Sequence, residues 1–272
     1  MTTLCSASIR GGAVLSYAVL GDVRAAVPLM LHRPLGGSMA LWGELATRLS
    51  ERFPIVVFDP RGVGLSSAAP LAHGTRDMAR DGVDLLNVLG VSRAHHFGLS
   101  LGGMVASWVA IDSPRRVARL VLASTLPRAA AISHRVRRHI EPVARAFLRH
   151  GSAAEVGLVR DVLSPAFRRD HPERVREIEA LVRGAPTTHR NLFALALAAA
   201  RHDAAASLPR VTAPTLLLFG GRDEIAGRHA RHELEGEIPE ALVEMIPDAG
   251  HDLSLEVPRL LADRVIAFLS ID

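Results

Sequence analysis

Six short apolar runs constrain the fold of this chain more than any other sequence feature. Each run is apolar at nearly every position, and each is followed by a turn that contains Gly, Pro or Asp. Continuous hydrophobicity over so few residues is typical of strands that are buried on both faces of a sheet. The runs cover residues 28–32, 55–59, 94–99, 120–124, 214–219 and 242–246.

Helical periodicity accompanies these runs, because apolar residues recur every three or four positions along residues 42–49, 78–89 and 255–269. Strands that alternate with such helices predict an α/β fold with a mostly parallel, doubly wound sheet. The first twenty residues instead alternate around Arg10 and two glycines, which predicts an N-terminal hairpin and not a signal peptide. Sheets of this kind bind ligands at the carboxyl ends of their strands, so we expect the functional residues in those loops.

The strand pattern stops between residues 126 and 210. This stretch contains Arg- and Ala-rich helical segments, such as 135–150 and 191–201, which glycine and proline residues separate. A helical block inserted between two sheet strands predicts a cap over the active face. We therefore expect a core of residues 1–125 and 211–272 and a helical cap of residues 126–210, since 272 residues can bury a substantial core.

All 32 basic side chains are arginines, and lysine is absent. The composition therefore excludes enzymes that form a Schiff base through lysine, and phosphate loops that need a Gly-Lys pair. The net charge of +4 gives little reason to expect nucleic acid or a membrane surface as partner. The single cysteine, Cys5, cannot form an internal disulfide, and neither CxxC nor HExxH occurs.

No apolar segment reaches the roughly eighteen residues of a membrane span, and a cytoplasmic protein is the default expectation. We expect no metal and no cofactor. The expected partner is a small-molecule substrate, while a monomer and a homo-oligomer both remain open.

A G-x-S-x-G pattern is centred on Ser100, between the buried run 94–99 and an apolar helical stretch, 104–111. In this strand–turn–helix setting a tight, strained turn holds the serine hydroxyl above the sheet, and the flanking glycines leave room for the backbone. A glycine-rich turn with an incidental serine is the alternative. Because a serine hydroxyl is a poor nucleophile at neutral pH, a base and an orienting acid should accompany Ser100.

Two later strand ends offer these partners. Asp223 follows the run 214–219 in the sequence GGRD, and His251 follows the last run in the sequence PDAGH. A surface ion pair with Arg222 is the alternative role of Asp223, and any one of the 13 histidines is more often a structural or surface residue. The position of both residues directly after strands favours Asp223 as the acid and His251 as the base.

The oxyanion that forms during acyl transfer needs backbone N–H donors. Leu101 directly follows Ser100 at the start of a helix, where the helix dipole also favours negative charge. The loop after the run 28–32 should supply a second donor. Pro34 has no N–H, so Leu35 is the better candidate in that loop, although the loop could also be a simple glycine-rich connection.

Taken together, these motifs resemble the cap-bearing α/β-hydrolase superfamily, and within it the 3-oxoadipate enol-lactonases and related small esterases. The resemblance covers the whole chain except the cap, where only the architecture is similar. It implies that Ser100 is the nucleophile, Asp223 the acid and His251 the base. The motifs are PLMLHRPLGGS, VVFDPRGVGLSS, HHFGLSLGGMVASWVA, RLVLAST, TLLLFGGRDE and AGHDLSLEVP.

The lactonase branch is indicated mainly by PLGG and by GLSLGGMV followed by Trp108, which we take as a substrate-binding candidate. Many members have His-Gly where this chain has Arg33-Pro34. This departure makes the oxyanion donor of that loop less certain and could bring the Arg33 guanidinium near the substrate entrance. Asp59 and Arg61 lie in a turn that is usually structural in the family.

The predicted function is therefore that of a serine hydrolase, which cleaves a small ester or lactone through an acyl-enzyme. A natural-product tailoring esterase, a thioesterase, a cofactor-free lyase and a perhydrolase are alternatives on the same fold. A ligand receptor with slow turnover is an alternative of another class. Fold alone does not decide among them.

The positive charge is concentrated in the predicted cap, where residues 126–210 contain 15 arginines and 8 acidic residues. A solvated helix face is one explanation of this excess. The other is that Arg128 and Arg135, which follow soon after a strand end, steer or clamp an anionic substrate. An enol-lactone with a free carboxylate would be such a substrate.

Overall fold

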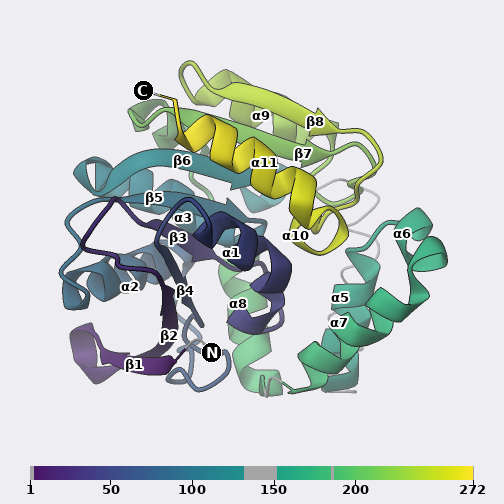
Figure 1. The fold of residues 1–272 in the computed structure, drawn as a ribbon, viewed down its shortest axis with the longest axis horizontal. Coiled ribbons are helices and arrows are strands. Elements are labelled where there is room, and N and C mark those ends of the chain that lie inside the picture. The colour runs from purple at the N-terminus through teal and green to yellow at the C-terminus, as the bar shows by residue number, and fades with distance from the viewer. Residues whose placement is uncertain (1–2, 132–151, 185–186, 272) are drawn as a thin grey trace.

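The computed structural model describes residues 3–131, 152–184 and 187–271, which contain an eight-stranded sheet in the order β1-β2-β4-β3-β5-β6-β7-β8 (Figure 1). The strands are β1 (Leu4–Ser8), β2 (Val14–Leu20), β3 (Leu29–His32), β4 (Ile55–Phe58), β5 (Ala94–Leu99), β6 (Val117–Ala123), β7 (Thr215–Gly220) and β8 (Leu242–Ile246). β1 and β2 form the predicted antiparallel hairpin, and β2 pairs antiparallel with β4. The pairs from β4 through β3 to β8 are parallel, which confirms the predicted sheet.

Alternate residues of the parallel strands from β3 to β7 face opposite layers of helices, which explains why these runs are apolar at nearly every position. The prediction of burial on both faces is wrong for β8, an edge strand in which Leu242 and Met245 are exposed. In β6, Leu120 and Leu122 belong to the same buried cluster as α3 (Leu101–Asp112). Val121 and Ala123 belong instead to the cluster of α1 (Gly43–Ser50) and α11 (Pro258–Leu269). Burial on both faces leaves little room for polar side chains, so the chemistry is confined to strand ends.

The remaining core helices are α2 (Thr75–Val88), α9 (Arg228–Glu237) and α10 (Leu253–Glu256). The predicted helix over residues 255–269 is wrong in its first part. α10 ends before Val257, which has a non-helical backbone with φ of −134° and ψ of 49°, and α11 begins at Pro258, the position where the missing N–H of proline costs no hydrogen bond. Short 3₁₀ helices are η1 (Arg10–Gly12), η2 (Met39–Trp42), η3 (Pro114–Arg116), η4 (Ala129–Ala131) and η5 (Ala205–Arg210).

Between β6 and β7 lie four described helices, named here the inserted helices: α5 (Ser152–Asp161), α6 (Pro165–Asp170), α7 (Pro172–Gly184) and α8 (His189–Ala200). α8 corresponds to the predicted helix 191–201, whereas the predicted helix 135–150 lies outside the described residues. Figure 1 shows α5, α6 and α7 together at one side of the sheet. A buried apolar cluster joins α5 and α7 to Leu41 of η2 and Leu255 of α10.

Within the described residues, no helix has both the length and the hydropathy that crossing a bilayer requires.

Candidate active site

The turn between β5 and α3 holds Ser100 in a strained backbone conformation, with φ of 54° and ψ of −118°. Its glycines are required by close packing. A Cβ on Gly98 would collide with the carbonyl group of Gly102, and a Cβ on Gly102 would collide with the backbone at the end of β3. A Cβ on Gly103 would meet the side chain of Thr125. The predicted sharp strand-to-helix turn is therefore present, and its packing excludes larger residues.

Ser100, His251 and Asp223 are joined by hydrogen bonds, although the three residues lie far apart in the sequence. The distance from Ser100 Oγ to His251 Nε2 is 2.8 Å, and His251 Nδ1 lies 2.9 and 3.0 Å from the two carboxylate oxygens of Asp223. Asp223 Oδ1 also accepts hydrogen bonds from the backbone N–H groups of Ile225 and Ala226. These bonds fix the carboxylate, which in turn fixes the orientation of the imidazole.

The electrostatics of His251 favour the imidazolium form, in which both ring nitrogens carry a proton. Burial is the largest single influence and lowers the pKa of the imidazole, but the carboxylates of Asp223, Asp252 and Glu256 together outweigh it. The pKa of His251 is therefore raised above its ordinary value. A base whose protonated form is stabilised in this way is suited to accept a proton from a serine hydroxyl.

The two candidate oxyanion donors lie at the start of α3 and in the loop that follows β3. Leu101 is the first residue of α3, where backbone N–H groups have no carbonyl partner in a preceding turn. Leu35 is half-buried and packs against the cluster that contains Leu101. Gly36 and Gly37, which follow Leu35, have φ values of 85° and 71°, a region that favours glycine. Donation to an oxyanion by Leu35 and Leu101 remains a prediction.

Arg33 is buried, in contrast to the expected position at a substrate entrance. Its guanidinium lies 4.6 Å from the centre of the Trp42 ring and 3.8 Å from a carboxylate oxygen of Asp252, and only 2% of the side chain is exposed. Burial lowers the pKa of Arg33, while Asp252 and Asp59 oppose this effect. The side chain thus lies between the loop that follows β3 and the loop that carries His251.

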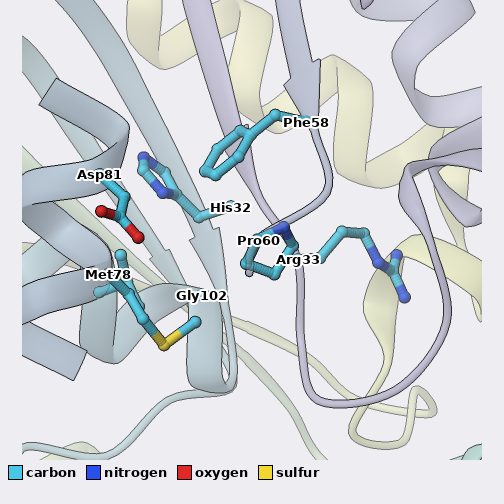
Figure 2. A pocket seen from close by; sticks show the side chains of 8 residues that line it. His32, Arg33, Phe58, Pro60, Met78, Asp81 and Gly102 are labelled. Carbon is cyan, nitrogen blue, oxygen red and sulfur yellow. The ribbon is translucent and has the colours of Figure 1, made fainter. Parts of the chain in front are cut away.

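A cavity of about 10 Å³ lies beside the backbone of Arg33, lined also by His32, Phe58 and Met78. Figure 2 shows the Arg33 side chain extending away from these neighbours. The volume suffices for about one water molecule, so this cavity is too small for a substrate. A larger cavity of about 360 Å³ lies between α6 and the loop that follows β8. Ser100 lines neither of the two.

Two of the other three substrate-binding candidates lie in the described residues, and both contact protein groups. Trp108 is buried in the α3 cluster, under the guanidinium of Arg76 at 4.7 Å from the ring centre, and packs edge-on against His202. Arg128 forms a 2.7 Å ion pair with Glu233 of α9. Arg135 lies outside the described residues. Substrate contact by these residues therefore remains a prediction.

Most of the described arginines of the inserted helices pair with neighbouring acids. Arg174 pairs with Glu177, and Arg183 pairs with Glu179. Arg169 pairs in the same way with Asp170, next to it in sequence. This arrangement favours the solvated, ion-paired helix face over a cluster of free cations for the described part of the segment.

Asp59 and Arg61 link their turn to η2 and α2, as expected for a structural motif. Asp59 Oδ1 accepts a 2.6 Å hydrogen bond from the N–H of Met39, and Arg61 forms two hydrogen bonds with Asp81. Within the described residues, no group of three or more His, Cys, Asp or Glu side chains could hold a metal ion.

Sequence reasoning missed two glutamates next to the candidate site. Glu155 of α5 accepts a hydrogen bond from Gly37, and Glu256 of α10 accepts hydrogen bonds from Ser164 and Gly250. Acceptor and donor are 118 residues apart in the first case and 92 apart between Glu256 and Ser164. Contacts over such separations leave no local pattern in the sequence.

A model of the alpha/beta hydrolase fold family matches residues 27–258. The chain belongs to the α/β-hydrolase family. A relative within it is the "Putative carbamate hydrolase RutD" of Variovorax paradoxus (strain S110), which is 30% identical over 246 residues, 89% of this chain and 91% of the relative. This α/β-hydrolase is thus homologous to proteins named as hydrolases along nearly its whole length.

Solved structures of α/β-hydrolases agree with this assignment. A thermophilic esterase from Thermogutta terrifontis superposes with a TM-score of 0.83 at 27% identity, with 98% of each chain covered. The enol-lactonase from Burkholderia xenovorans LB400 superposes with a TM-score of 0.86 at 24% identity, over 98% of this chain and all of the other. At that identity the enol-lactonase shows the shared fold alone.

Proposed function

We propose that the protein is a serine hydrolase that cleaves a small ester or lactone through an acyl-enzyme, with Ser100, His251 and Asp223 as its catalytic residues. The observation that carries the proposal is the chain of hydrogen bonds from the Ser100 hydroxyl through His251 to Asp223, built on a strained turn. The geometry fits nucleophile, base and orienting acid in that order.

In the proposed reaction, His251 Nε2 takes the proton from Ser100 as the serine oxygen attacks the substrate carbonyl. The negative charge on the carbonyl oxygen is stabilised by the backbone N–H groups of Leu101 and Leu35. Asp223 stabilises the imidazolium, which then donates its proton to the leaving alcohol. His251 next deprotonates a water molecule, and attack of this water on the acyl-enzyme releases the acid and regenerates Ser100.

The homologues support acyl transfer to water but differ in the substrates that their names state. An esterase is 27% identical to this chain, and proteins named as carbamate hydrolases are up to 30% identical among those compared. A carbamate is therefore the second candidate substrate, because attack on its carbonyl would use the same residues. Carboxylate-bearing esters are a further class to test, although Arg33 and Arg128 both lie next to protein carboxylates.

A substrate panel with two serine variants tests the proposal. The panel contains aryl esters, small lactones, carboxylate-bearing esters, thioesters and carbamates. Ser100→Ala should lower kcat for every hydrolysed substrate by about 10⁴-fold or more and abolish labelling by a fluorophosphonate. Ser107→Ala, which removes a buried hydroxyl from the same helix, is the matched control and should retain activity.

Full turnover by Ser100→Ala would refute the nucleophile assignment. Very slow turnover of every substrate by the wild type, combined with a ligand-dependent rise in Tm, would favour a receptor over an enzyme.

A further inference from the structure

Two carboxylates link the inserted helices to the loops of the candidate active site. One carboxylate belongs to the inserted helices, and the other belongs to the core. Glu155 extends from α5 to the loop that carries Leu35, while Glu256 extends from α10 to the connection between α5 and α6. Both side chains form hydrogen bonds to backbone N–H groups. The two loops involved are those that hold the proposed oxyanion donor and the proposed base.

Glu256 joins the residue before His251 to the α5–α6 connection through hydrogen bonds. Its Oε2 accepts a hydrogen bond of 3.1 Å from the N–H of Gly250, the residue before His251. Its Oε1 accepts one of 2.6 Å from the N–H of Ser164, and the Ser164 hydroxyl donates to Oε2 at 2.8 Å. The same hydroxyl oxygen accepts from the N–H of Phe167 at the start of α6, so it is ordered on both sides.

The backbone strengthens this bridge. The carbonyl oxygen of Val162 accepts hydrogen bonds from the N–H of His251 at 3.1 Å and from that of Asp252 at 3.4 Å. A Cβ on Gly250 would collide with Glu256 and lie 2.8 Å from the nitrogen of Ser164. The contact between the α5–α6 connection and the His251 loop is thus too close to tolerate an added methyl group.

Glu155 holds the other loop. It is 1% exposed, and its Oε1 accepts a buried hydrogen bond of 2.9 Å from the N–H of Gly37. A Cβ on Gly36 would lie within 3.7 Å of Glu155, Leu158 and Val159, so α5 lies directly against this loop. Burial raises the pKa of Glu155, while the hydrogen bond from Gly37 opposes this effect. Burying a carboxylate costs free energy, and the hydrogen bond that Glu155 accepts from Gly37 offsets part of that cost.

We propose that Glu155 and Glu256 are positioning residues. Through them the α5–α6 part of the inserted helices fixes the loop that carries Leu35, named here the oxyanion loop, relative to the loop that carries His251. Glu155 sets the position of the loop that carries Leu35. Glu256 and Ser164 set the position of the loop that carries His251. This inference rests on the proposed function, and it makes this part of the insertion a brace for the catalytic groups and not a freely opening lid.

The mechanism predicts a loss of kcat with little change in KM. Glu155→Ala and Glu256→Ala should each lower kcat for p-nitrophenyl acetate by about 10- to 100-fold, because displacements near 1 Å have effects of this size. KM should change by less than about threefold, since neither carboxylate contacts the substrate in the proposed reaction. The binding of a boronic acid transition-state analogue should weaken in parallel with kcat.

Amide variants distinguish the two carboxylates. Glu155→Gln keeps an oxygen for the single N–H of Gly37, so it should restore kcat to within about threefold of the wild type. Glu256→Gln keeps only one of two accepting oxygens, whereas the backbone N–H groups of Ser164 and Gly250 donate to different ones. It should therefore restore kcat only in part.

Asn191→Ala is the matched control. Asn191 of α8 also accepts a hydrogen bond across to the core, 3.2 Å from the N–H of Ala69, but in a loop that carries none of the proposed catalytic groups. It should leave kcat within about twofold of the wild type even if Tm falls. If the glutamate variants affected kcat no more than Asn191→Ala at a matched loss of Tm, the positioning role would be wrong.

A measurement independent of turnover separates this inference from the proposed function. The proton on His251 Nδ1, bonded to Asp223, should give a low-field ¹H NMR signal that Glu256→Ala shifts or broadens and Glu155→Ala leaves in place. An unchanged signal in Glu256→Ala would overturn the role of Glu256. If the wild type neither hydrolysed any ester nor reacted with a fluorophosphonate, the proposed function would fail, and the NMR result would still decide whether Glu256 positions His251.

Discussion

The Ser100 turn and the His251 loop are held in place by different means. The turn is fixed by its own neighbours, because glycines at 98, 102 and 103 pack against backbone and Thr125 with no room for a Cβ. The His251 loop is held by hydrogen bonds to Glu256 of the following helix and to the Val162 carbonyl oxygen of the α5–α6 connection, and Ser164 of the same connection donates to Glu256. One part of the candidate site is thus held mainly by close packing, and the other mainly by hydrogen bonds.

This difference predicts different responses to mutation. Changes in the Ser100 turn should affect folding and activity together, since packing errors in a close-packed interior propagate. Changes around His251 should affect the electrostatics and position of the base while the fold survives, because a hydrogen bond contributes only about 1 kcal/mol to stability. Variants in each region test whether stability and activity respond differently.

Gly102→Ala should have the largest effect of the variants below. The added methyl group would overlap the carbonyl group at the end of β3, and only a backbone shift can relieve this contact. We expect a loss of about 3 kcal/mol or more in the free energy of unfolding, together with the loss of esterase activity. Urea unfolding and an aryl ester assay measure both.

The control for this variant is Gly236→Ala in α9, where the added Cβ would meet open space. It should be unchanged in stability or more stable by up to about 1 kcal/mol. Equal stability of the Gly102 and Gly236 variants would show that the Ser100 turn does not depend on close packing.

Asp252→Asn should have an intermediate effect, seen in the pH profile. His251 must be neutral to act as a base, so kcat/KM should rise with pH through its pKa, with a midpoint above the ordinary imidazole value. Burial lowers this pKa, but the charge and hydrogen bond of Asp223 together with the charges of Asp252 and Glu256 raise it above the ordinary value. Removing the Asp252 charge should therefore move the midpoint to lower pH.

Asp248→Asn provides the comparison within the same loop, because 91% of the Asp248 side chain is exposed. Its profile should coincide with that of the wild type. A midpoint that shifts equally in both variants would indicate a general charge effect and not a specific contact with the base.

Arg128→Ala should have the smallest effect. The Arg128 side chain is 44% exposed and pairs with Glu233, and surface pairs of this kind contribute about 0–1 kcal/mol. We expect kcat/KM for both neutral and carboxylate-bearing esters to stay within about twofold of the wild type. A rise of tenfold or more in KM for the acidic ester alone would instead establish Arg128 as a substrate clamp.

The sequence was most informative where chemistry and local backbone constraints coincide. The buried runs predicted the parallel strands, because burial on both faces requires apolar residues at every position. The G-x-S-x-G pattern predicted the turn, since only glycine fits at 98 and 102. Asp223 and His251 could be found because each follows a strand whose neighbours in the sheet end at the same edge.

Sequence reasoning failed where a side chain's partner comes from a distant segment. The sequence allowed a position of Arg33 near the substrate entrance and gave no sign of its burial beside Trp42 and Asp252. The roles of Glu155 and Glu256 could not be predicted, because the sequence alone does not distinguish a buried glutamate from a solvated one. The break at Val257 could have been anticipated, since Pro258 follows it and the residue before proline disfavours helix.

The pair of histidines beneath the oxyanion loop has a consequence for handling the protein in acid. His32, the last residue of β3, lies with its Nε2 3.0 Å from Nδ1 of His96, and both are buried. Burial lowers the pKa of His96 to about 3 and that of His32 well below its ordinary value. As the pH falls below the ordinary imidazole pKa, an unfolded chain gains protons that these folded residues do not accept, so stability declines steadily. The protein should therefore become less stable to unfolding in mild acid, and a neutral buffer is the natural condition for storage and assay.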